Sequence, residues 1–331
     1  MLEQLNQLPK LPSIASLRKM TPAARREMWV GLAFLSPWLF GFMVFTLIPL
    51  VATIIFSFAN LKITDGVTNP LKFAGLSNYI QYFTDPQIWN MSGGTPGAWL
   101  ITLKFGLIAL PIGILVPLGL ALLVNNKNLK GQTAARTLFY LPSIVPLIAS
   151  IVIWGGMLNS ESGWINRFLI FMGMPKELTP GWLNSATWVY PGYVIIGLWG
   201  VGSAMLIVLA GLQGVPTELY DAAKMDGANG VQIFFNITFP MISPVIFYNL
   251  ILGMVGLFQY YLLPFVLNNG NGSPGGTTMF YNVYLVRTFL TFQNMSYGAT
   301  MAIGLFVVIL LATLILFASA KYWVYYAGET R

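Results

Sequence analysis

The sequence predicts an all-α integral membrane protein with six transmembrane helices. Of its 331 residues, 56% are hydrophobic and only 8% are charged, whereas a soluble domain carries about 25% charged residues. The mean hydropathy is +0.71. A hydrocarbon core about 30 Å thick requires roughly 20 mainly apolar residues in a helix. Six stretches meet that requirement, and they are residues 29–59, 99–124, 138–158, 188–212, 241–263 and 299–320.

The positive charges predict how these spans are oriented. Six crossings place both termini on one side, and the side whose short loops hold more Lys and Arg is cytoplasmic. The richer face would hold Lys10, Arg18, Lys19, Arg25, Arg26, Lys127, Lys130, Arg136, Lys224, Lys321 and Arg331. The poorer face would hold Lys62, Lys72, Arg167, Lys176 and Arg287. We therefore expect cytoplasmic N- and C-termini. Lys104 lies near the outer end of the second span, where we expect its aliphatic stem to carry the ammonium to the interface.

These spans divide the chain into segments. We expect a cytoplasmic leader over 1–28, a permanent first transmembrane helix over 29–59, an extracytoplasmic loop over 60–98, a transmembrane domain over 99–320 and a cytoplasmic tail over 321–331. The outer loops, which also include 159–187 and 264–298, are too short for large separate domains. Their proline and glycine residues predict turns and short surface helices.

The composition excludes several kinds of chemistry. The chain has no Cys and no His, which removes disulfides, thiolate nucleophiles, imidazole bases and the usual zinc and haem ligands. Apart from Lys104, no span contains Asp, Glu, Arg or Lys at bilayer depth, which argues against an ion-coupled carrier. The acids of the outer loops are scattered at Asp65, Asp85, Glu161 and Glu177. No Gly-x-x-x-x-Gly-Lys-Ser/Thr motif is present, so no phosphate cradle for ATP is expected. We expect neither an enzyme nor a cofactor or metal site.

The connection between the fourth and fifth spans is the most informative segment. Pro216 suits the first turn of a helix, Glu218 follows where an acid meets the positive end of the helix dipole, and Lys224 lies near the other end. Gly227 can adopt the left-handed conformation that ends a helix. The pattern predicts a short cytoplasmic helix from Pro216 to Asp226. A second helix is expected from about Asn229 into the fifth span.

The first of these helices has a smooth surface, because it presents Ala222 and Ala223 beside Leu219 and Met225. Such a surface suits the cleft of a partner protein, but a capped helix lying on lipid has the same composition. The spacing of a longer motif favours the partner protein over the lipid surface. Importer permeases of the binding-protein-dependent ATP-binding cassette (ABC) class have a cytoplasmic motif that reads Glu-Ala-Ala, three residues, Gly, nine residues, then Ile-x-Leu-Pro.

This chain resembles that motif closely. It reads Asp221-Ala222-Ala223, then Gly227, then Ile237-Thr238-Phe239-Pro240 at the same spacing. Asp replaces Glu and Phe replaces Leu. The resemblance covers about 29–320 and is closest to carbohydrate-uptake permeases of the maltose and glycerol-phosphate type. Further matching strings are 119–122, 136–142, 153–154, 163–166 and 209–216. The Thr-Gly-Gly-Pro expected after the fifth span is replaced by residues 268–274.

The resemblance implies a type I ABC importer permease with a MetI-like core and one extra N-terminal helix. It implies a prokaryotic inner-membrane complex with a second, homologous permease as heterodimer partner, two ATPase subunits that bind ATP and Mg²⁺, and an extracytoplasmic solute-binding protein, without nucleic acid. The segment 213–240 would couple to an ATPase cleft. The coupling residues that follow are Glu218, Asp221, Ala222, Ala223, Asp226, Gly227, Ile237 and Pro240.

For the substrate, uncharged sugar hydroxyls are best met by amides, hydroxyls and aromatic rings. In maltose-type permeases a polar and aromatic run at the position of Gln259 and Tyr260 contacts sugar, so these two are the leading candidates, with Asn249 and Tyr140 behind them. The same side chains would equally serve hydrogen bonds between helices.

We therefore expect a sugar permease, with an oligosaccharide as the favoured substrate. A permease for a glycerophosphodiester should place Arg or Lys on the pathway, and only Lys104 is available. A membrane enzyme or scaffold is the alternative from another class.

Overall fold

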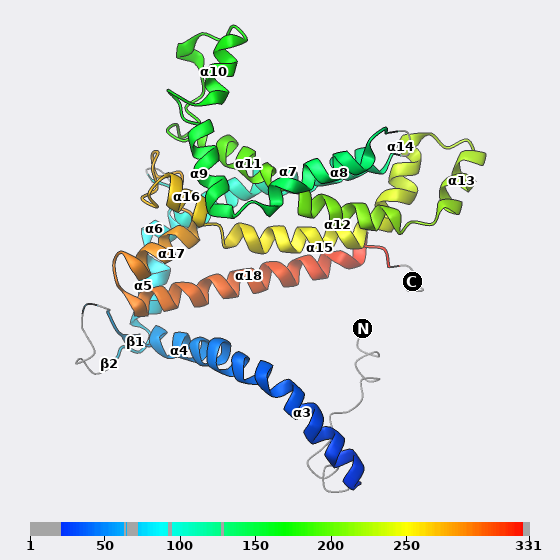
Figure 1. The fold of residues 1–331 in the computed structure, drawn as a ribbon. Coiled ribbons are helices and arrows are strands. Elements are labelled where there is room, and N and C mark those ends of the chain that lie inside the picture. Colours follow the sequence, from blue (N-terminus) through cyan, green and yellow to red (C-terminus); the bar gives the residue numbers. More distant parts are fainter. Residues whose placement is uncertain (1–20, 63, 65–71, 92–94, 127–128, 327–331) are drawn as a thin grey trace. The chain divides into compact units, whose positions relative to one another are not determined.

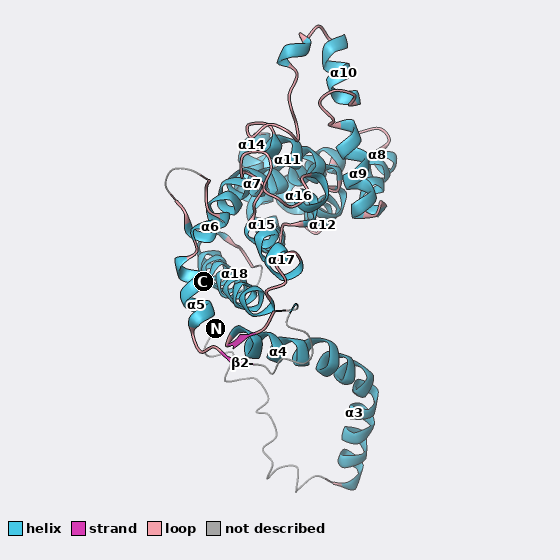
Figure 2. Ribbon diagram, turned by 90° about the vertical axis from the view of Figure 1, so that its left-hand side faces the viewer, coloured by secondary structure: helices cyan, strands magenta, loops and turns pink. Residues whose placement is uncertain are grey.

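The computed structural model describes residues 21–62, 64, 72–91, 95–126 and 129–326. Several residues used in the charge argument lie outside the described residues, namely Lys10, Arg18, Lys19, Asp65, Lys127 and Arg331. The chain divides into two compact units, Met1–Ile55 and Phe56–Arg331. Both units are mainly helical where they are described, and the second also contains two short strands and several loops (Figures 1 and 2).

The first unit holds one long apolar helix. It comprises α3 (Pro22–Phe42), the π-helical stretch η1 (Met43–Leu47) and α4 (Ile48–Ser57), whose last residues belong to the second unit. The Thr21 side chain caps its start by accepting a hydrogen bond from the Ala24 N–H at 3.3 Å. No residue of α3 is buried, and a helix that is apolar on all sides is typical of a lipid-embedded one. The helix begins seven residues before the predicted span.

The second unit contains the remaining elements. Their bounds are β1 (Ala59–Asn60), β2 (Lys72–Phe73), α5 (Ser77–Thr84), α6 (Pro86–Trp89), α7 (Ala98–Asn125), α8 (Gln132–Tyr140), η3 (Leu141–Ile144), α9 (Leu147–Met157), α10 (Trp164–Phe171), η4 (Lys176–Leu178), α11 (Val189–Trp199), α12 (Gly202–Gln213), α13 (Thr217–Met225), α14 (Gly230–Ile233), η5 (Phe234–Thr238), α15 (Phe239–Phe258), α16 (Leu262–Leu267), α17 (Tyr281–Leu290) and α18 (Met295–Trp323). The two strands pair antiparallel, with Ala59 opposite Phe73.

Two predicted spans are broken. The helices over Pro22–Ser57, Ala98–Asn125, Gly230–Leu267 and Met295–Trp323 are each long and apolar enough to cross a membrane. The predicted span 138–158 is instead α8 with η3, followed by α9 at an angle of 99°, and 188–212 is α11 followed by α12 at 58°. The described helices therefore give six spans only if each bent pair counts as one.

The local sequence explains both bends. Pro142 and Pro146 flank the first break, where the missing N–H groups and ring clashes end α8. Gly200 and Val201 form the second break, and Gly202 begins α12. The sequence contained these residues, but proline within a span predicts a bend without giving its angle.

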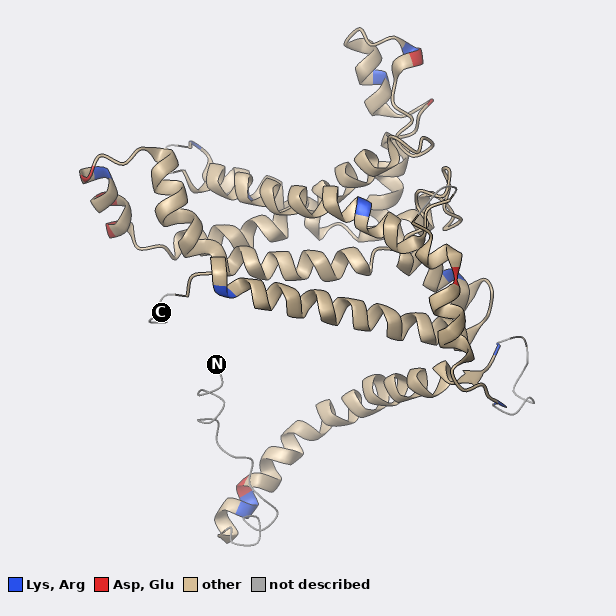
Figure 3. Ribbon diagram, turned by 180° about the vertical axis from the view of Figure 1, so that it is seen from behind, with Lys and Arg blue, Asp and Glu red and all other residues tan. Residues whose placement is uncertain are grey.

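Within the second unit, several apolar helices pack against α7. This helix contacts α11, α12, α15 and α17. Buried apolar side chains such as Phe105, Leu118 and Val208 fill the contacts. In Figure 3 the ribbons of α15 and of nearly all of α18 carry no charged residue, whereas α13 carries both signs.

A carboxylate links three helices of the second unit. Asp85 caps α6 by accepting the Gln87 N–H at 2.9 Å. Its other oxygen accepts the hydroxyl groups of Tyr284 at 2.9 Å and Tyr297 at 2.6 Å. Burial raises the pKa of Tyr284, so this hydroxyl keeps its proton and remains a donor at neutral pH. Asp85, which the sequence analysis left among the scattered acids, therefore links α6 to α17 and α18.

Candidate coupling segment and translocation pocket

The predicted cytoplasmic helix is present as α13, and its two ends explain its length. Pro216 has ψ 130° and directly precedes Thr217, the first residue of the helix, so the start lies within one residue of the predicted one. At the other end the Gly227 N–H donates to the Lys224 carbonyl at 3.1 Å and the Ala228 N–H donates to the Ala223 carbonyl at 2.9 Å. This pair of bonds is a Schellman motif, which needs a left-handed residue at its centre. Gly227 has φ +78° and fills that position.

The second predicted helix also begins where expected. Asn229 and Gln232 form a reciprocal capping box, with bonds of 2.9 Å from the Gln232 N–H and 2.8 Å from the Asn229 N–H. The Asn-x-x-Gln spacing was available in the sequence as a start signal, although the sequence analysis did not use it. From there α14, η5 and α15 run on as one helix to Phe258.

The coupling candidates fall into two groups. Ile237 packs against the buried cluster around Leu212 and Ile242, and Pro240 is partly buried in the first turn of α15. The candidates from Glu218 to Gly227 lie on or directly after α13, which has no buried residue. The side chain of Met225 is 88% exposed.

The charges on α13 are exposed as well. Asp221 and Lys224 form an ion pair of 3.4 Å with side chains 73% and 65% exposed. Such a pair contributes at most about 1 kcal/mol. Tyr220, which sequence reasoning missed, reaches the Thr238 hydroxyl at 3.3 Å and joins α13 to η5.

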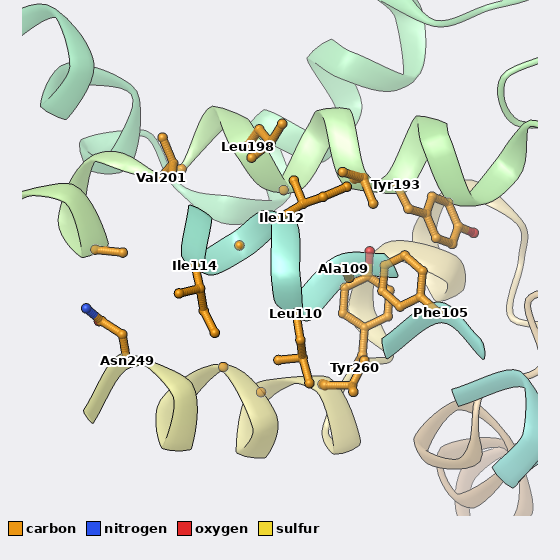
Figure 4. A pocket seen from close by; sticks show the side chains of 18 residues that line it. Phe105, Ala109, Leu110, Ile112, Ile114, Tyr193, Leu198, Val201, Asn249 and Tyr260 are labelled. Carbon is orange, nitrogen blue, oxygen red and sulfur yellow. The ribbon is translucent and has the colours of Figure 1, made fainter. Parts of the chain in front are cut away.

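The sugar candidates lie around two neighbouring pockets. The first has a volume of about 380 Å³ and lies between α7, α11, α12 and α15. Figure 4 shows Asn249 at one end of it and the rings of Phe105, Tyr193 and Tyr260 at the other. Asn249 carries a buried side-chain Nδ2 that has no hydrogen-bond partner within the described ranges.

The second pocket, of about 570 Å³, is lined by η3, α9, α11 and the break between α15 and α16. Gln259 and Tyr260 line it at that break, where the chain leaves the helix for three residues. Tyr260 lines both pockets. Ser150 and Ser203 also line the second pocket and were missed by sequence reasoning, because hydroxyl residues in a span usually bond back to the helix.

The fourth sugar candidate, Tyr140, lies away from the two pockets. Tyr140 lies at the end of α8, 39% exposed, and lines neither pocket. Lys104 is exposed on α7 and lines neither pocket. Both pockets are lined without a charged side chain, and the described residues contain no group of acids that could hold a metal ion. These pockets can offer hydrogen bonds and aromatic surface to a neutral solute.

Comparison with known proteins decides the family. Residues 109–325 match the family model of the binding-protein-dependent transport system inner membrane component. The chain belongs to this family. It is 34% identical over 95% of its length to a probable ABC transporter permease, YesP, of Bacillus subtilis, and it covers 98% of that protein. This permease is therefore a transport subunit of the inner membrane and not an enzyme.

Further relatives carry more specific names. The sulfoquinovosyl glycerol transport permease SmoG of Agrobacterium fabrum is 32% identical over 78% of this chain and 79% of that protein. The arabinooligosaccharides permease AraP of Bacillus subtilis is 31% identical over 85% of each chain. A solved bacterial ABC transporter that imports alginate shares the fold, with a TM-score of 0.75 over 89% of this chain and 96% of that one at 22% identity.

Proposed function

We propose that this permease forms half of the translocation pathway of an ATP-driven importer for a sugar, with an oligosaccharide as the favoured class. The observation that carries the proposal is the pair of adjoining pockets, which present amide, hydroxyl and aromatic groups and no charge. Relatives named for arabinooligosaccharides, sulfoquinovosyl glycerol and lactose transport support it.

The glycerophosphodiester alternative has less support. A phosphodiester carries a full negative charge, and proteins bind it with Arg or Lys. Among the described residues, no cation lines either pocket, and Lys104 lies elsewhere on α7. Membership of a transport family decides against the enzyme or scaffold hypothesis.

The same proposal covers the complex and its orientation. The permease pairs with a second homologous permease, two ATPase subunits that bind ATP and Mg²⁺, and an extracytoplasmic solute-binding protein, with both termini cytoplasmic. In this arrangement α13 docks in the cleft of an ATPase. Closure of that cleft moves α13, and the Tyr220–Thr238 contact and Ile237 pass the movement to the continuous helix that ends at Phe258, directly before Gln259. Rigid-body movement of this helix then alternates access to the pockets.

The direct test uses the permease with its co-encoded partners in nanodiscs. We expect ATP hydrolysis to rise when the solute-binding protein carries a neutral oligosaccharide, since importer ATPases respond to a loaded receptor. A panel of arabino-, gluco- and galacto-oligosaccharides and a glycerophosphodiester gives the comparison. Stimulation by the phosphodiester alone would contradict the assignment of a sugar.

The pocket residues give a second test. Replacing Tyr260 by Phe removes one hydroxyl and keeps the ring among Phe105, Tyr193 and Phe280. Loss of one neutral hydrogen bond costs about 0.5–1.5 kcal/mol, so we expect the half-saturating sugar concentration for uptake into proteoliposomes to rise roughly two- to tenfold. Gln259→Ala should raise it as well.

Tyr248→Phe is the matched control, because Tyr248 is exposed on the same helix and lines neither pocket. Equal uptake kinetics in all three variants would remove Gln259 and Tyr260 from the pathway.

A further inference from the structure

A third cavity, of about 470 Å³, lies beside α13 and differs in chemistry from the two pockets above. It is bounded by residues of α7, α8, α12 and α13. Eight of its ten lining residues have polar or charged side chains. Its volume lies in the range of small-molecule sites, roughly 300–1,000 Å³. A cavity this polar is built to receive a polar ligand.

The charges in this cavity are not balanced. Its charged residues are Arg136, Lys224 and Asp221, and the last two already form an ion pair. The Arg136 Nε is buried and has no hydrogen-bond partner, and in the described part of the chain no carboxylate lies within ion-pair distance of Arg136. A guanidinium is always charged in proteins and cannot shed its proton to avoid this cost. Arg136 is partly exposed as a residue, but its Nε is a buried donor without a partner, which is costly, so the unpaired guanidinium suits an anion.

We propose that this cavity binds a ligand that carries both a phosphate group and hydroxyl groups. The planar guanidinium of Arg136 matches two phosphate oxygens, and Lys224 supplies a second cation. Asn125, Gln132 and Gln213 line the same cavity, and amides both donate to and accept from hydroxyls. Two sources share this chemistry. One is a soluble sugar phosphate, and the other is the headgroup of an anionic glycerophospholipid.

Such a ligand would act on the coupling helix. The cavity wall joins Arg136 of α8 to Lys224 of α13, whereas α13 itself buries no side chain. A phosphate held between the two cations braces α13 against the transmembrane helices. Its occupancy would thereby tune how freely α13 moves. This proposal concerns a site apart from the translocation pockets and does not depend on which solute is transported.

The test measures binding of glucose 6-phosphate to the complete transporter in phosphatidylcholine nanodiscs by isothermal titration calorimetry, with glucose as the uncharged comparison. We expect saturable binding of glucose 6-phosphate and none of glucose. Arg136→Gln should weaken that binding roughly ten- to hundredfold, because it removes a charge-assisted pair. Lys130→Gln is the control. It removes one positive charge from an exposed residue two positions before α8, and this residue does not line the cavity.

Nanodiscs that contain phosphatidylglycerol separate the two sources. A lipid occupant would lower the apparent affinity of the unmodified transporter for glucose 6-phosphate and would have no such effect on Arg136→Gln. Unchanged affinity would identify the soluble ester as the ligand.

Three results would overturn the proposal. They are absence of saturable glucose 6-phosphate binding in both nanodisc types, equal weakening by Arg136→Gln and Lys130→Gln, and loss of ATPase subunits from the Arg136→Gln complex. The last would show that Arg136 pairs with a carboxylate of the ATPase. Sugar-stimulated ATP hydrolysis, measured in parallel, reports on the proposed transport function independently.

Discussion

Replacing Gly227 by Val is expected to uncouple ATP hydrolysis from uptake while the permease still inserts into the membrane. The φ of +78° at this position centres the Schellman motif that ends α13. A residue with a Cβ costs about 1–2 kcal/mol in this region, which lowers the equilibrium ratio of native to non-native helix ends roughly 5- to 30-fold. A β-branched side chain is among the least suited to it. We expect uptake into proteoliposomes to fall by up to this factor, with basal ATP hydrolysis retained.

Two variants separate strain from bulk. Nothing lies within 4 Å of a Cβ built at Gly227, so a steric clash does not account for the loss. Gly230 has equally open surroundings and no positive φ, and Gly230→Val should therefore leave uptake close to normal. Gly227→Asn should restore much of the loss, because Asn tolerates the left-handed conformation. Full uptake in Gly227→Val would show that this helix end has no part in coupling.

Gly202→Ala is expected to produce the largest loss of stability. Gly202 is the buried first residue of α12, directly after the break that follows α11. A Cβ here would overlap the Phe139 carbonyl oxygen and lie 2.7 Å from the Tyr140 Cα. Both are backbone atoms of α8, so relief requires movement of the helix and not of a side chain. Overpacking of this kind costs about 1–3 kcal/mol.

The measurement is the temperature at which half of the detergent-solubilised complex loses its native elution in size-exclusion chromatography. Gly119→Ala is the matched control, since Gly119 lies within α7 and nothing is within 4 Å of a Cβ there. We expect a clear decrease for Gly202→Ala and no decrease for Gly119→Ala. Equal midpoints would mean that α8 and α12 can separate without cost.

The sequence predicted best where a feature depends on near neighbours. Both ends of α13 could be predicted, because each depends on residues in its own turn. Pro216 and Glu218 act at the start of the helix, and Lys224 and Gly227 act at its end. Apolar length likewise placed the long helices. The bend of 99° after α8 was out of reach, because the angle depends on what packs against the chain after Pro142 and Pro146.

Sites assembled from distant segments were predicted less completely. Gln259 and Tyr260 were chosen from the resemblance to maltose-type permeases, and the structure adds that they lie where the helix is interrupted, close to α9 and α11. Asp85 binds hydroxyls of residues about two hundred positions away, and no local pattern reports such a partner. The cavity at Arg136 is formed by four helices that are separated in the sequence, so the excess of positive charge in it could not be predicted without the fold.

The absence of buried side chains in α13 has a consequence for how such transporters diversify. In the proposed docking arrangement, substitutions at the exposed positions of α13, away from the partly buried Tyr220, alter the surface that an ATPase meets without disturbing the packed interior. Under this proposal, a permease would acquire a preference for a different energy-supplying subunit through a handful of changes on one helix of nine residues, leaving its solute route as it was.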